Sequence, residues 1–94
     1  MGQFEEQHKV ALISCIEVVL MRKGDTRRHL VHARLSSLYN CDIRDSYEHP
    51  EYLRAVLKDV YKEDFNSVIE EIKLLLDDLV NEKDIDDFFK IMEG

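Results

Sequence analysis

The clearest pattern of hydrophobic and polar positions lies between residues 50 and 79, where apolar residues recur every three or four positions. This spacing places them on one face of an α-helix. Pro50 suits the first helical position, where a backbone N–H has no partner within the helix. We therefore expect one helix from Pro50 to about Tyr61 and another from about Asp64 to Val80, packed together through two apolar faces. The first face carries Leu53, Val56, Leu57, Val60 and Tyr61, and the second carries Phe65, Val68, Ile69, Ile72, Leu75, Leu76 and Leu79.

The N-terminal segment predicts a helix from about Phe4 to Arg22 that is apolar on more than one side. A surface helix of a small protein normally carries a single apolar stripe. Two explanations stay open: the helix is central to the fold, or it forms a seam between two copies of the chain. The residues expected at such an interface are Val10, Ile13, Ile16 and Leu20.

Three further segments complete the expected fold. Lys23 and Gly24 end the first helix, and Asp25 or Thr26 offers a side-chain oxygen as N-cap of a second helix that ends near Asn40. Residues 40–49 form the longest connection, with room for a short helical turn anchored by Ile43 and Tyr47. A last short helix starts at Asp84, so the chain is expected to be one all-α domain (residues 1–94), a compact bundle of four to five helices.

Composition supports this picture. Hydrophobic residues make up 45% of the chain and charged residues 35%, which is typical of a folded helical protein and not of a disordered one. The two cysteines do not form a secreted disulfide framework. The first residues are too polar for a signal peptide, and the apolar run from Val10 to Met21 is too short to cross a bilayer. We therefore expect a cytoplasmic protein that does not enter a membrane.

The charge is distributed unevenly. The net charge is −7, and residues 63–94 hold eleven acids and three bases, whereas residues 1–62 hold nine acids and ten bases. A local basic patch consists of Arg22, Lys23, Arg27, Arg28 and Arg34. Such a patch could bind phosphates, although overall acidity argues against general affinity for nucleic acid. The acidic C-terminal third could instead dock a basic partner.

Candidate chemistry is weak. His29 and His32 could share a helix face, and Cys41 or His49 could complete a zinc site, but solvated histidines explain this spacing better. The sequence contains no glycine-rich phosphate loop, no serine elbow and no pair of closely spaced cysteines. We therefore expect no catalytic residue, no metal site and no cofactor.

Several stretches together resemble one protein family. They are Tyr39-Asn40-Cys41-Asp42-Ile43, His49-Pro50-Glu51-Tyr52-Leu53, Val56-Leu57, Tyr61, Ile69, Ile72 and Leu76. In this order they resemble the Nitrosopumilus output domain family, a group of small helical archaeal modules, over roughly residues 25–90. The family often has glycine after the aromatic that ends the third helix, where this chain has Lys62. The resemblance implies an output part of a signalling or regulatory protein and supplies no catalytic residues.

Two function classes follow. The first is a small non-enzymatic protein-interaction module, an output or adaptor domain in archaeal signalling, whose partner is unknown and which could form a homodimer. The alternative is a DNA-binding, transcription-type regulator that uses the basic patch. Nucleic acid is the less favoured partner because of the net negative charge.

Overall fold

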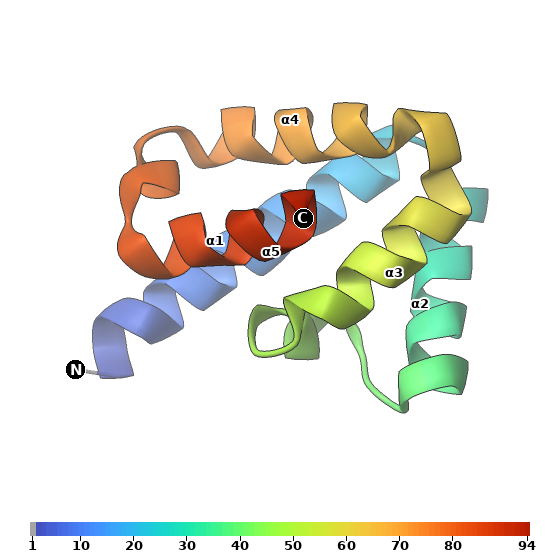
Figure 1. The fold of residues 1–94 in the computed structure, drawn as a ribbon, viewed down its shortest axis with the longest axis horizontal. Coiled ribbons are helices and arrows are strands. Elements are labelled where there is room, and N and C mark those ends of the chain that lie inside the picture. Colours follow the sequence, from blue (N-terminus) through green and yellow to red (C-terminus); the bar gives the residue numbers. More distant parts are fainter. Residues whose placement is uncertain (1) are drawn as a thin grey trace.

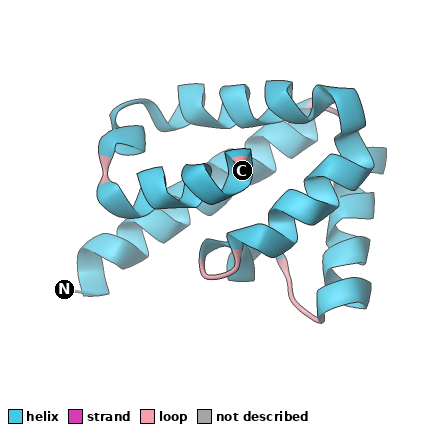
Figure 2. Ribbon diagram, in the orientation of Figure 1, coloured by secondary structure: helices cyan, strands magenta, loops and turns pink. Residues whose placement is uncertain are grey.

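The computed structural model describes the backbone of residues 2–94 and the side chains of residues 6–94. Five α-helices and three short 3₁₀-helices follow one another, and no strand occurs within residues 2–94 (Figures 1 and 2). The expected all-α bundle of four to five helices is confirmed. The elements are α1 (Gly2–Arg22), α2 (Asp25–Tyr39), η1 (Ile43–Tyr47), α3 (Pro50–Tyr61), η2 (Lys62–Asp64), α4 (Phe65–Leu76), η3 (Asp77–Asn81) and α5 (Lys83–Glu93).

Helix α1 is the central element of the bundle. Its residues Leu12, Ile16, Val19 and Leu20 are fully buried. Helix α4 lies along α1, and α2, η1 and α5 also contact it, so that α1 runs behind α5 in Figure 1. Burial of these side chains supplies a large share of the hydrophobic stabilisation, at about 1.5–3 kcal/mol for each fully buried Leu, Ile or Val. Within residues 2–94 every helix, including this one, falls short of the length or the hydrophobicity that a membrane crossing requires.

Helices α3 and α4 do not pack face to face as expected. The apolar face of α4 lies on α1, whereas that of α3 lies on α2 and α5. The two helices contact each other only sparsely, because η2 turns the chain between them. Both apolar faces still belong to the same hydrophobic core. Val56 of α3 is 1% exposed and Ile72 of α4 is 0% exposed, and both are part of that core. Periodicity identified most residues of the two buried faces, although Leu75 is 38% exposed, but it did not identify the elements that cover these faces.

Two helix boundaries differ from the expectation. Gly24, and not Asp25 or Thr26, occupies the N-cap position of α2, with φ of 114° and no capping side chain. Helix α4 ends at Leu76, because Asp77 adopts a positive φ of 54° and the chain continues as η3 instead of reaching Val80 in one helix. Lys62 likewise has a positive φ of 51°. Residues other than glycine adopt such angles only at an energetic cost.

The connection between α2 and α3 contains the expected helical turn, η1. Asp42 caps it: its side chain accepts the backbone N–H of Arg44, and the side chain of Asp45 accepts the backbone N–H of Asp42. Ile43 is buried and anchors the turn in the core. Reciprocal capping of this kind fixes a short segment that could not hold its shape by helical hydrogen bonds alone.

Candidate interaction surface

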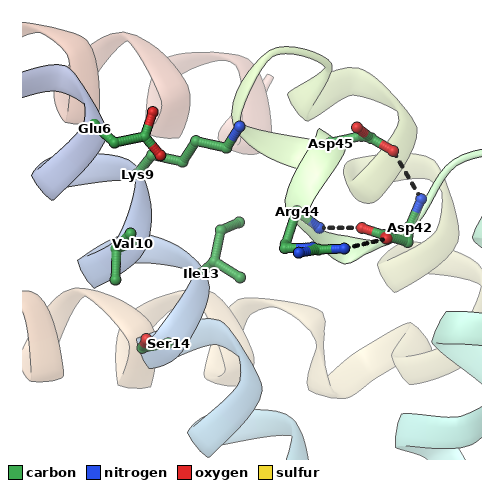
Figure 3. A pocket seen from close by; sticks show the side chains of 8 residues that line it. All are labelled: Glu6, Lys9, Val10, Ile13, Ser14, Asp42, Arg44 and Asp45. Carbon is green, nitrogen blue, oxygen red and sulfur yellow. Dashed lines mark hydrogen bonds and ion pairs between the residues drawn. The ribbon is translucent and has the colours of Figure 1, made fainter. Parts of the chain in front are cut away.

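A groove of about 500 Å³ separates the N-terminal half of α1 from η1 (Figure 3). Val10 and Ile13 give its α1 wall an apolar surface, and charged side chains surround them. Three acids and two bases line the groove, so its formal charge is slightly negative. The lining residues are Glu6, Lys9, Val10, Ile13 and Ser14 from α1, and Asp42, Arg44 and Asp45 from the η1 side.

The two walls of the groove are held by polar contacts. Lys9 Nζ in α1 donates to Glu48 Oε1, just after η1, over 3.3 Å. Asp42 Oδ1 accepts the backbone N–H of Arg44 at 2.8 Å, and Asp45 Oδ2 accepts the backbone N–H of Asp42 at 2.9 Å. Chiefly the Arg44 N–H bond lowers the pKa of the Asp42 carboxyl, against an opposing effect of partial burial. Asp42 therefore keeps its negative charge at neutral pH, and these hydrogen bonds fix the conformation of the η1 wall.

A hydrogen-bond cluster joins both walls of the groove to α5. His8 Nδ1 lies 3.0 Å from Asp84 Oδ1, and Tyr47 Oη donates to Asp84 Oδ2 at 2.5 Å. Burial acts to raise the pKa of Asp84, but the hydrogen bonds from Tyr47 and His8 outweigh it and the pKa is lowered. We refer to His8, Tyr47 and Asp84 as the Asp84 cluster. It brings α1, η1 and α5 together at one point.

The basic patch is largely neutralised within the fold. Four of its five cations lie at acids supplied by α2, α3, η2 and α4. Lys23 Nζ is 2.7 Å from Glu71 Oε2, Arg27 Nη1 is 3.0 Å from Asp64 Oδ2, Arg28 Nε is 3.6 Å from Asp25 Oδ1, and Arg34 pairs with Asp59. Arg22 is exposed and makes no salt bridge with any side chain of residues 6–94. Within residues 6–94, Arg22 is therefore the one cation of the patch without a salt bridge, and its charge acts only at longer range, where, in addition to the hydrogen bond from Lys23, it helps to lower the pKa of Glu71.

The histidines and cysteines considered for zinc are dispersed. His32 Nε2 lies 3.1 Å from Glu17 Oε1, and His49 stacks on the ring of Tyr52 with centroids 4.9 Å apart. Among the residues whose side chains are described, no three His, Cys, Asp or Glu residues come together as a metal site. Burial raises the pKa of the Cys41 thiol, and the nearby Asp45 and Asp42 carboxylates raise it further. This thiol is therefore a poor thiolate donor at neutral pH.

The interface expected on α1 needs correction. Ile16 and Leu20 are fully buried and Ile13 is 9% exposed, so these three residues belong to the core. Of the four expected interface residues only Val10, at 58% exposure, lies on the surface. The apolar run of α1 is explained mainly by its central position, because four other elements cover it.

A different row of α1 is exposed along its whole length. Glu6, Val10, Ser14, Val18 and Arg22 recur every four positions, and all five are exposed. Three of them, on successive turns, also form part of the groove wall in Figure 3. We call these five residues the outer row. Its signal in the sequence is an i, i+4 repeat with an acid at one end and a base at the other, which the dense apolar pattern of this segment obscured.

Comparison with protein-family models, with curated proteins and with solved structures finds no match for this chain.

Proposed function

We propose that this protein is a non-enzymatic protein-interaction module and that the outer row of α1, with the groove beside it, is its contact surface. One observation carries the proposal. The central helix of the fold exposes Val10 and Val18, at 58% and 40%, on one continuous row that ends in two charges without salt bridges among the described side chains. Single exposed apolar residues are ordinary, but here two of them share one row of the central helix, and one of the two, Val10, also lines the groove.

The arrangement of charges favours a protein over nucleic acid as the partner. Lys23, Arg27, Arg28 and Arg34 already have carboxylate neighbours, so phosphate groups would have to compete with Glu71, Asp64, Asp25 and Asp59 for them. The net charge of −7 adds long-range repulsion. Affinity for DNA depends on cations that are free to release counterions from phosphates, and here one such cation of the patch is left.

The biological setting comes from the sequence resemblance. An output or adaptor role in archaeal signalling fits a small module that binds through one helix face and performs no chemistry of its own. The Asp84 cluster fits the same role, since its three side chains hold the walls of the groove in a fixed relative position. A preformed surface binds with a smaller loss of conformational entropy than a flexible one.

The test is site-specific photo-crosslinking in the cells from which the protein comes. A photoreactive amino acid replaces Val10 or Val18 in the outer row, and Glu70, exposed on α4, in a control variant. We expect protein adducts from the two row positions and few from position 70. Equal labelling from all three positions, or none, would contradict the proposal.

A DNA-binding measurement provides the second arm. Fluorescence anisotropy of a labelled DNA duplex at low salt should show no saturable binding by the wild-type protein. Saturable binding that weakens when Arg22 is changed to Ala, and also weakens with added salt, would support the DNA-binding alternative instead.

A further inference from the structure

We infer that the outer row of α1 binds the same row of a second copy of this chain, in an antiparallel arrangement with a two-fold axis at Ser14. The inference rests on the proposed function, because it names the partner of that contact surface. A two-fold interface uses one patch twice, so the patch must be complementary to itself. The order of residues along the row meets this condition.

The row reads acid, apolar, small, apolar, base. When a second row lies alongside in the opposite direction, Val10 meets Val18 of the partner subunit, Ser14 meets its own equivalent, and Glu6 meets Arg22 of the partner subunit.

Helix packing provides the geometry for such a contact. Residues four apart form a ridge inclined by about 26° to the axis of an α-helix, so the ridges of two facing helices run parallel when the helices cross at about −50°. The outer row is a ridge of this kind, about 24 Å long at 1.5 Å per residue. Ser14 at the crossing point lets the backbones come close.

The charges at the ends of the row support the same occupant, and they act against the repulsion between two chains that each carry a net charge of −7. Glu6 and Arg22 are exposed and form no salt bridge with any described side chain, whereas most neighbouring cations are paired. The groove beside Glu6 is lined by three acids and two bases, so a cation arriving there meets a slightly negative surface. In the antiparallel arrangement that cation is Arg22 of the partner subunit. The contact is small, so we expect a weak dimer that forms reversibly with concentration.

Charge reversal tests the pairing directly. Sedimentation equilibrium from micromolar to millimolar protein should give a mass that rises from one chain to two for the wild type. Glu6→Arg or Arg22→Glu should each weaken dimerisation about tenfold, because two attractive pairs become repulsive. Glu6→Arg combined with Arg22→Glu in one chain should restore it. Circular dichroism and melting temperature check that every variant is folded, and Glu70→Arg serves as the control for a charge change elsewhere.

The most specific test of the pairing is to mix the Glu6→Arg and Arg22→Glu variants and to measure whether they form a heterodimer. Glu6→Arg carries two cations at the ends of its row and Arg22→Glu carries two anions, so the two chains should pair with each other although neither pairs well with itself. A wild type that stays monomeric at millimolar concentration, or a mixture that shows no association beyond its components, overturns the inference. If crosslinks from Val10 and Val18 to another protein persist in that case, the proposed function stands without a homodimer; if they are absent too, both fail.

A disulfide cross-link between two copies of the chain tests whether the two-fold axis lies at Ser14. In a background where Cys15 and Cys41 are changed to serine, Ser14→Cys should oxidise rapidly to a disulfide-linked dimer, because the two-fold relation brings that residue next to its equivalent. Ser37→Cys, exposed on α2, serves as the control and should oxidise slowly. Equal rates for the two variants would contradict an axis at Ser14.

Discussion

His8 Nδ1 and Asp84 Oδ1 lie 3.0 Å apart, although 76 positions separate the two residues in the chain. Tyr47 joins the same carboxylate at 2.5 Å, so one side chain connects α1, η1 and α5. Asp84 is also close to the N-terminus of α5, where the helix dipole favours a negative charge. This cluster fixes the position of the N-terminal half of α1, which carries half of the outer row.

Asp84→Asn should lower the free energy of unfolding by about 1–3 kcal/mol, the usual range for the loss of hydrogen bonds to a charged group. Asp86→Asn is the matched control, since Asp86 is exposed on the same helix and pairs only with Lys90 among the described residues; we expect about 0.5 kcal/mol or less. Urea unfolding followed by circular dichroism measures both. Equal losses in the two variants would show that the Asp84 cluster does not stabilise the fold.

The same cluster predicts a dependence of stability on pH. The pKa of Asp84 is lowered from its ordinary value of 3.8 in the folded protein, so its contribution is present above that value and is lost as pH falls through the folded pKa. Unfolding measured from about pH 6 to about pH 3 should therefore show a smaller acid-induced loss in Asp84→Asn than in the wild type. Parallel curves for the two proteins would contradict this assignment.

Lys62→Gly should stabilise the protein by about 1 kcal/mol, because Lys62 has φ of 51° and glycine adopts positive φ without steric cost. Glu70→Gly, in an exposed position inside α4, is the control and should destabilise by a similar amount. Thermal and urea unfolding should show an increase in the free energy of unfolding for Lys62→Gly and a decrease for Glu70→Gly. A destabilised Lys62→Gly variant would argue that this side chain contributes more than its backbone costs.

Val56→Asp and Ile72→Asp should each abolish cooperative unfolding, because a carboxylate without a partner would enter the core. Ala55→Asp and Leu74→Asp are neighbouring controls on the same two helices, exposed in the structure, and should unfold cooperatively. Differential scanning calorimetry distinguishes the two groups. Sharp transitions in both core variants would refute the packing of α3 and α4 into one core.

Cys41 should react slowly with iodoacetamide at neutral pH, because burial and the carboxylates of Asp45 and Asp42 raise the pKa of its thiol. In a Cys15→Ser background, which isolates Cys41, the alkylation rate should rise with pH above the normal thiol range. Asp45→Asn should increase the rate at neutral pH by removing a negative charge. An unchanged rate would show that the carboxylate has no influence on this thiol.

Much of the fold follows from local chemistry in the sequence. Pro50 starts α3 as expected, and the apolar repeats of α3 and α4 coincide with their buried faces except at Leu75. The helix boundary that was predicted wrongly at Val80 depends on a backbone angle that the residue type does not indicate. Asp77 adopts a positive φ, and aspartate gives no clear signal for this conformation in the sequence. The N-cap of α2 was also predicted wrongly. Gly24 occupies that position, although the neighbouring Asp25 is a residue type with a stronger preference for it.

The candidate surface was harder to predict, because it depends on which elements cover a helix. Ile16 and Leu20 have the sequence pattern of an interface, and the contact of α4 and other elements with α1 makes them core instead. The basic patch lost most of its apparent charge in the same way. Asp59, Asp64 and Glu71 lie 25 to 48 positions from the cations that they neutralise, and no local rule connects them.

The order of the helices has a consequence for synthesis on the ribosome. Helix α1 is made first, yet α4 and α5, which cover it, are made last. At 5–20 residues per second, its apolar face waits about 4 to 14 s for the final helix to be translated. During that interval the nascent chain displays Leu12, Ile16, Val19 and Leu20 to its surroundings, so the newly made protein is most vulnerable to chaperone capture or aggregation before its C-terminal third emerges.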